Sequence, residues 1–172
     1  MRDIVIYDAC VFIDAINMGI LEVLSKAGAI IHTTSLVTNE ILLPVQKNAI
    51  EKWLNIQVLR YDTIDQYDEL NKFRSTIYPQ KNLSLPDFSV LKLAIDMAVP
   101  LYTSDSGLRK VAQIHGVQVH GSLGLVIELY RCGALSKVEA QVAIDKLQET
   151  NSRISERVIE EALHELGFMK SK

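Results

Sequence analysis

Short apolar runs alternate with helical patterns from residue 4 to residue 119, and this alternation constrains the fold more than any other feature. The apolar runs that read as strands cover residues 4–7, 29–32, 56–60, 100–105 and 117–119. The segments between them carry apolar side chains at helical spacing. Strands that are separated by helices form parallel sheets with helices on both faces. The sequence therefore predicts an α/β fold, three layers (α/β/α) around a central parallel sheet of about five strands.

From Gly121 onward only helical patterns remain. Ser136 and Glu139 have the spacing of a capping box, which supports a helix start at that point. We expect residues 1–133 to form the α/β domain and residues 134–172 to form a C-terminal helical extension. Its apolar stripes predict that the extension packs on the domain or on a second copy of the chain.

The composition favours a soluble globular protein, because 48% of the 172 residues are hydrophobic and 23% are charged. No apolar run approaches the roughly 20 residues that a membrane helix needs. The N-terminus lacks the basic region and the apolar core of a signal peptide. We therefore expect a cytoplasmic protein without a membrane partner. The net charge of −3 means that any nucleic-acid binding would depend on a local basic patch.

The cysteines and histidines suggest no site for a soft metal ion. Cys10 and Cys132 are far apart and stand in apolar contexts, which predicts two buried free thiols. The four histidines show no spacing typical of metal ligands.

Two acidic residues directly follow predicted strands. Asp8 comes after the run at residues 4–7, and Asp105 ends the run at residues 100–105. Ligands of open parallel sheets bind beyond the carboxyl ends of the strands. We therefore expect both carboxylates at the same edge of the sheet.

Two further acidic residues interrupt the apolar stripes of predicted helices. Glu40 lies four residues after Leu36, inside the stripe of a helix at residues 36–43, so it is expected to face inward. Asp87 extends the stripe of a helix at residues 86–98 toward the helix start. Its carboxylate is expected to point at the strand ends.

Each acid also has a purely structural interpretation. Asp87 follows Ser84 by three residues, which is capping-box spacing, and Asp8 and Asp105 could cap the helices that follow them. The long side chain of Glu40 could reach past an apolar face to water. These interpretations treat the acids separately and leave their convergence on one edge unexplained.

Converging carboxylates favour a hard metal ion. Two carboxylates about 4 Å apart repel each other by roughly 4 kcal/mol at an effective dielectric near 20, so a cluster takes up protons or binds a cation. An oxygen ligand set without histidine or thiolate suits Mg²⁺ or Mn²⁺. Such ions support phosphodiester hydrolysis, in which they activate a water and stabilise the leaving oxygen.

The order of four motifs resembles the PIN-domain nucleases. These motifs are "YDACVFI", "TNEIL", "LPDFSVLKLA" and "LYTSDSGLRKVAQIHGVQV". The helices after Gly121 resemble a subgroup of that family related to VapC-type toxins. The resemblance implies a Mg²⁺- or Mn²⁺-dependent ribonuclease with an RNA substrate, an antitoxin protein as partner and a homodimeric state.

The resemblance also implies roles for individual residues. The catalytic and metal-binding acids are Asp8, Glu40, Asp87 and Asp105. Thr103 matches the hydroxyl residue before the last acid, and Cys10 stands where the family often has Asn, Ser or Thr.

Basic residues near the motifs are candidates for phosphate contacts. Arg109 and Lys110 follow Asp105 by about one helical turn, and Lys81 precedes the third motif. A solvated helix face is the more common role of such residues and accounts for them without a ligand. Asp14 follows Asp8 by six residues and is interpreted as a surface acid.

Other functions remain open. A catalytically weak or inactive PIN-like module that binds RNA or protein shares the same motifs. A receiver-type phospho-acceptor domain expects a lysine at the end of the last strand, where His120 and Gly121 stand instead. A haloacid-dehalogenase-type phosphatase expects a second acid at the position of Cys10. Neither of these last two alternatives explains Glu40.

Overall fold

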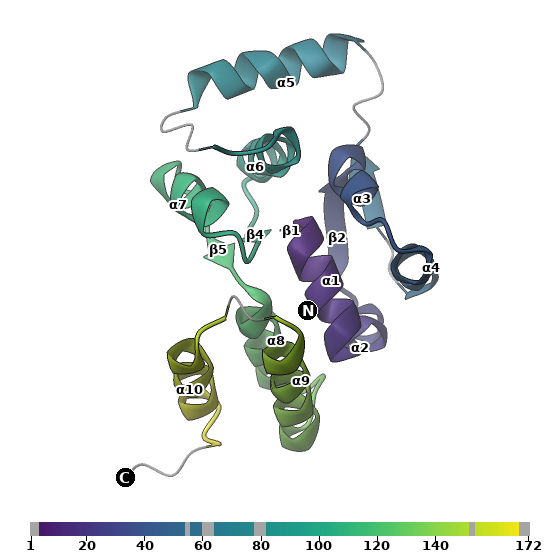
Figure 1. Cartoon of the computed structure of the whole chain (residues 1–172), viewed down its shortest axis with the longest axis vertical. Helices are drawn as coiled ribbons and strands as arrows, with labels where there is room; N and C mark the ends of the chain where they lie inside the picture. Colours follow the sequence, from purple (N-terminus) through teal and green to yellow (C-terminus); the bar gives the residue numbers. More distant parts are fainter. Residues whose placement is uncertain (1–3, 54–55, 60–63, 78–81, 152–153, 169–172) are drawn as a thin grey trace.

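The computed structural model describes residues 4–53, 56–59, 64–77, 82–151 and 154–168 (Figure 1). Its centre is a parallel sheet of five strands in the order β3-β2-β1-β4-β5. The strands are β1 (Ile4–Tyr7), β2 (Ile30–Thr34), β3 (Ile56–Leu59), β4 (Leu101–Tyr102) and β5 (Val119–His120). This arrangement confirms the predicted α/β class with a central parallel sheet.

Ten helices connect and follow the strands within the described residues. They are α1 (Ala9–Met18), α2 (Leu21–Lys26), α3 (Ser35–Glu40), α4 (Pro44–Trp53), α5 (Ile64–Thr76), α6 (Leu85–Met97), α7 (Ser106–Ile114), α8 (Ser122–Arg131), α9 (Lys137–Thr150) and α10 (Glu156–Glu165). None of the helices in this part of the chain is long and apolar enough to cross a membrane.

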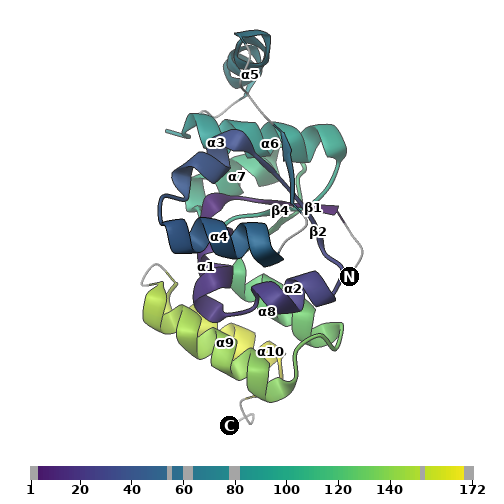
Figure 2. The same cartoon turned by 90° about the vertical axis from the view of Figure 1, so that its right-hand side faces the viewer.

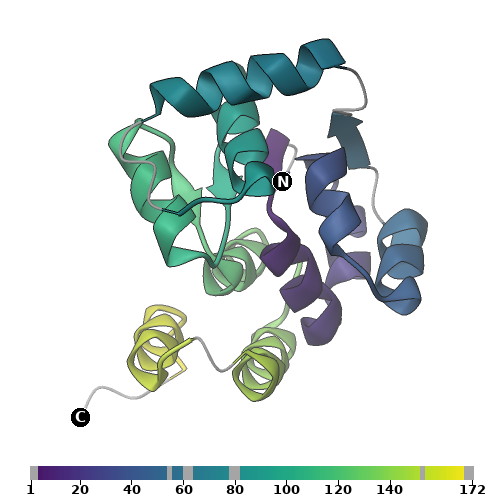
Figure 3. The same cartoon turned by 45° about the horizontal axis from the view of Figure 1, so that its top comes forward.

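The helices cover both faces of the sheet, which gives three layers (Figure 2). Helices α6 and α7 lie on one face, and α1, α2 and α8 lie on the other. Helix α5 packs on the outer side of α6 (Figure 3). Because both faces are covered, strand side chains such as Ile6, Ile31 and Leu101 are fully buried.

The helices of the predicted extension pack on the rest of the molecule. Helix α9 contacts α1 and α8, and α10 contacts α8 and α9. The buried stripe of α9 recurs at helical spacing through Ala140, Ala143, Ile144 and Leu147. The predicted capping box of Ser136 and Glu139 is confirmed at its start. The division of the chain into two domains at residue 133 stays a prediction.

Three expectations about local structure were wrong. The predicted helix at residues 36–43 ends at Glu40, because Ile41 has an extended backbone (φ −83°, ψ 95°). Pro44 starts the next helix instead of ending this one, which suits its fixed φ and missing N–H. Cys132 is exposed, and Cys10 is only partly buried, although both thiols are free.

Candidate functional site

Asp8 sits between β1 and α1, where the strand ends and the helix begins. Its Oδ1 accepts a hydrogen bond from the backbone N–H of Ala9 at 2.7 Å and caps α1. Its Oδ2 accepts from the hydroxyl of Thr103 at 2.8 Å and from the thiol of Cys10 at 3.1 Å. Only 5% of Asp8 is exposed, so these donors replace the water that burial removes from the carboxylate.

Thr103 connects Asp8 with Asp105. Strands β1 and β4 are neighbours, with Tyr7 paired to Tyr102, so the residues that follow them meet at one edge of the sheet. The buried Thr103 hydroxyl accepts from the backbone N–H of Asp105 at 3.0 Å while it donates to Asp8. Oδ1 of Asp105 accepts from the backbone N–H of Leu108 at 2.7 Å and caps α7.

Asp87 stands in the first turn of α6, which packs on β1 and β2. Its Oδ2 accepts from the backbone N–H of Ser84 at 2.7 Å, in the capping box that the sequence suggested. Burial raises the pKa of Asp87, and the contacts with Ser84 lower it. The charges of Asp8 and Asp105 raise the pKa further, so Asp87 lies within electrostatic range of both carboxylates.

Glu40 is the last residue of α3, and its side chain is exposed. The expectation that it faces inward was wrong, because α3 ends at this residue and no further turn packs over it. Burial of part of the side chain, followed by the charges of Asp8 and Asp87, raises the pKa of Glu40. Glu40 therefore lies at the same edge as the other acids while it remains open to solvent.

The four acids thus influence one another at one edge of the sheet. Asp8 and Asp87 act on Glu40, and Asp8 and Asp105 act on Asp87. Three of the four also bond to backbone N–H groups at helix starts, which confirms the helix-cap interpretation of these side chains.

These acids fit a hard cation in their chemistry and charge. All four offer carboxylate oxygens, and a cation would relieve the mutual repulsion. Among the described residues, however, no three His, Cys, Asp or Glu side chains lie together in a way that could hold a metal ion as they stand. Binding would therefore require the acidic side chains to draw closer to one another.

Cys10 acts as a hydrogen-bond donor beside the acids. Burial, and next the charge of Asp8, raises the pKa of its thiol to about 12. The thiol is therefore protonated at neutral pH and can donate to Asp8. The sulfur also accepts from the backbone N–H of Ser104 at 3.1 Å.

The candidate phosphate-binding residues have different surroundings. The guanidinium of Arg109 donates to the backbone carbonyls of Thr103 at 2.9 Å and Val119 at 3.5 Å. It therefore links the residue that follows β4 with β5. Lys110 is exposed on α7. Lys81 lies outside the described residues. The structure therefore leaves Lys110 as the more accessible of the first two.

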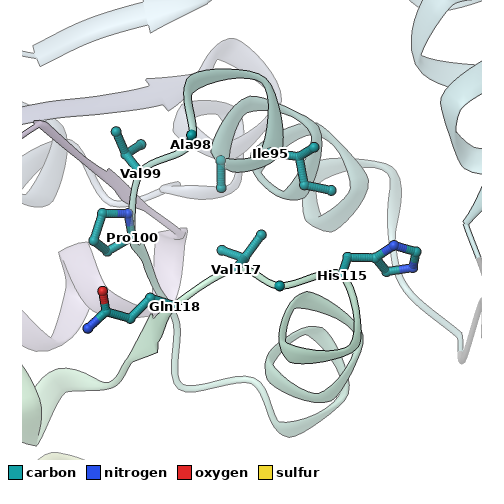
Figure 4. A pocket seen from close by; sticks show the side chains of 9 residues that line it. Ile95, Ala98, Val99, Pro100, His115, Val117 and Gln118 are labelled. Atoms are coloured by element: carbon teal, nitrogen blue, oxygen red, sulfur yellow. The ribbon is translucent and has the colours of Figure 1, made fainter.

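A pocket of about 400 Å³ lies at the opposite edge of the sheet (Figure 4). Pro100 and Gln118, which directly precede β4 and β5, form part of its wall. The remaining lining residues are Ala94, Ile95, Ala98, Val99, His115, Gly116 and Val117. None of the lining residues is acidic, so this pocket is separate from the edge that carries the acids.

Asp14 is a buried acid that the sequence interpretation missed. Only 4% of it is exposed, so its interpretation as a surface acid was wrong. It accepts hydrogen bonds from Ser122, Ser104 and Asn151, which come from three distant parts of the chain. A signal was present in the sequence, because Asp14 lies three residues after Val11 on the buried face of α1.

The raised pKa of Glu40 predicts how stability depends on pH without metal. The folded state binds the Glu40 proton more tightly than the unfolded chain does, so the charge costs stability as pH rises above the ordinary value of 4.5. Glu40→Gln lacks that charge. We expect it to match the wild type near about pH 4 and to be at least as stable near neutral pH.

Urea unfolding in EDTA at both pH values measures this difference. Glu51→Gln is the matched control, because Glu51 is an exposed glutamate of α4 and its loss changes the net charge equally. A Glu40→Gln protein that loses stability against the wild type as pH rises would contradict the expectation.

The sequence was also compared with known proteins. A family model described as a PIN domain matches residues 4–167. Among curated proteins, none matches the sequence.

Proposed function

Because the chain belongs to the PIN-domain family and so has a nuclease-type fold, we propose that it is a Mg²⁺- or Mn²⁺-dependent ribonuclease. Its active site would consist of Asp8, Glu40, Asp87 and Asp105. The observation that carries this proposal is the mutual electrostatic effect of the four acids at the carboxyl edge of the sheet. Helix capping accounts for Asp8, Asp87 and Asp105 one at a time and leaves Glu40 unexplained, whereas a shared cation accounts for all four carboxylates.

The side chains contribute in different ways. Asp8 is fixed by Thr103 and Cys10, so it would provide the rigid ligand of the site. Glu40 is exposed and would complete the ligand set from the solvent side. A bound Mg²⁺ or Mn²⁺ supplies the positive charge that activates water and stabilises the leaving oxygen. Lys110, one turn after Asp105, is available to contact an RNA phosphate.

A partner protein is a further part of the proposal. Three apolar side chains within five residues after Glu40 are exposed, namely Leu42 (76%), Leu43 (59%) and Val45 (76%). Neighbouring apolar side chains with this exposure are typical of a surface that another protein covers. Together with the resemblance to VapC-type toxins, this supports an antitoxin as partner and a homodimer as the form of the free protein.

A PIN-like binding module without effective turnover is the second candidate. One observation favours it, namely that no three potential ligands among the described residues are positioned to hold an ion. The two candidates differ in whether the purified protein cleaves RNA when Mn²⁺ is supplied.

The proposal is tested by incubating the purified protein with an RNA that has both single-stranded and paired segments. We expect cleavage in Mn²⁺ or Mg²⁺ and loss of cleavage when EDTA is added, because the acids repel one another and offer no catalysis without a cation. Excess Mn²⁺ added after EDTA should restore the activity. Cleavage that survives EDTA would contradict the proposal, and absence of cleavage in either metal would favour the binding module.

A further inference from the structure

We propose that Asp14 is a positioning residue that couples the end of α9 to the loop carrying Asp105. Asp14 lies in the middle of α1 and is 4% exposed. A buried carboxylate is stable only when hydrogen-bond donors surround it. The donors of Asp14 therefore have to stay in place, and each belongs to a different element of the fold.

The first donor comes from the C-terminal helices. Asn151 directly follows Thr150, the last residue of α9, and is the C-cap of that helix. Its amide Nδ2 lies 3.1 Å from both carboxylate oxygens of Asp14. The two residues are 137 positions apart in the sequence. This contact fixes the end of α9 against α1.

The other two donors connect Asp14 with the loop that carries Asp105. The hydroxyl of Ser122, the first residue of α8, donates to Oδ2 of Asp14 at 2.5 Å. The hydroxyl of Ser104 lies 3.4 Å from the same oxygen and 3.1 Å from the Ser122 hydroxyl. Ser104 directly precedes Asp105 in the loop between β4 and α7. Through the hydroxyl of Ser104, Asp14 therefore contacts the loop that carries Asp105.

The backbone of the loop is also held through Thr103, whose hydroxyl accepts from the N–H of Asp105 and whose carbonyl accepts from Arg109. The backbone N–H of Thr103 donates to the carbonyl of His120, and the N–H of Ser104 donates to the sulfur of Cys10. Thiol contacts of this kind are weak. The side-chain hydroxyl of Ser104 contacts Asp14 and Ser122, which fix its orientation. Asp105 follows Ser104 directly in the chain, so a displacement of Ser104 reaches the backbone of Asp105.

This inference rests on the proposed function for the role of Asp105, but the coupling itself does not. Loss of the Asn151 amide leaves the Asp14 carboxylate with one partner fewer, so the carboxylate must move toward its remaining donors or toward water. Either movement shifts Ser104. Removal of the Asn151 side chain at the end of α9 is thus expected to loosen the loop through Asp14.

Four variants and one control test the coupling. Asn151→Ala removes the donor from α9, Ser104→Ala removes the donor from the loop, and Asn151→Asp places a second carboxylate against Asp14. The control, Ser136→Ala, removes the capping side chain at the opposite end of α9 and weakens the same helix without reaching Asp14. Asp14→Asn removes the central carboxylate itself. If the Asp14→Asn protein does not fold, Asn151→Ala still tests the coupling.

The first measurement is hydrogen exchange of the Ser104 and Asp105 backbone amides by NMR. We expect exchange about threefold to tenfold faster in Asn151→Ala, faster still in Asn151→Asp, and unchanged in Ser136→Ala. Unchanged exchange at both amides in folded Asn151→Ala would overturn the inference. An equal increase in Ser136→Ala would overturn it too, because general loosening of α9 would then be the cause.

The second measurement is Mn²⁺ affinity by calorimetry. Supporting residues of a metal site typically change affinity by about tenfold or more, and the more distant Asn151 is expected to weaken it by about threefold to tenfold. If the wild type binds Mn²⁺ and cleaves RNA, unchanged affinity in both Asn151→Ala and Ser104→Ala would overturn the inference. If the wild type does neither, the proposed function fails, and the hydrogen exchange alone decides on the coupling.

Discussion

Asp8→Asn is expected to slow Mn²⁺-dependent RNA cleavage by at least about a hundredfold, more than the loss of a supporting residue costs. Asp8 is the buried acid of the set, and its charge acts on both Glu40 and Asp87. The substitution removes the charge. It also presents an amide N–H₂ or a single carbonyl to Thr103 and Cys10, which both donate to the carboxylate.

Asp96→Asn is the matched control, because Asp96 is exposed near the end of α6 and pairs with Lys92. Its cleavage rate should equal that of the wild type. Glu40→Gln is a second variant in the proposed site, and it is expected to keep the fold intact because Glu40 is exposed. It should lose at least about tenfold. Cleavage by Asp8→Asn within about tenfold of the wild-type rate would contradict the assignment of the site.

Leu147→Ala is expected to lower the free energy of unfolding by about 2–5 kcal/mol. Leu147 is fully buried on the stripe of α9, the helix that packs against α1 and α8. Removal of its side chain leaves a cavity that the surrounding helices cannot close. Urea unfolding of the purified variant measures the loss.

Val142→Ala on the same helix is the control, because 45% of Val142 is exposed. Its effect should stay within about 0.5 kcal/mol. Equal effects of the two substitutions would mean that α9 does not pack on the domain in solution. The predicted division of the chain at residue 133 is tested as well. A large loss would make the helices of the extension part of one cooperative fold with the domain.

The acidic edge was predictable because it depends on local pattern. Apolar runs that end in Asp8 and Asp105 identify strand ends, and parallel strands bring their ends together. The helix-cap interpretation was equally visible for Asp87 and Asp105. Sequence alone could not choose between a helix cap and a ligand site for these residues. In the structure one oxygen of each carboxylate caps its helix, and none of the hydrogen bonds among the described residues uses the other oxygen.

The orientation of Glu40 was not predictable from the same pattern. Leu42 and Leu43 continue the apolar spacing of α3, and Pro44 reads equally well as the end of one helix or as the start of the next. In the structure α3 ends first, so both leucines are exposed and Glu40 faces outward.

The burial of Asp14 depends on elements far along the chain. Helices α8 and α9 cover it more than 100 residues later, with Ser122 and Asn151 as its partners. No local pattern states which distant helix will pack over a given face, so an isolated acid on α1 appeared exposed.

The capping acids have an electrostatic consequence for the approach of a nucleic acid. Helices α1, α6 and α7 all begin at the acidic edge, with Asp8, Ser84 and Asp105 as their N-caps. The aligned peptide dipoles place roughly half a positive charge at each helix start. Three such helix starts partly offset the negative charge of the four carboxylates. An approaching nucleic-acid phosphate would therefore meet less electrostatic repulsion here than the number of acids suggests, although the protein has a net charge of −3.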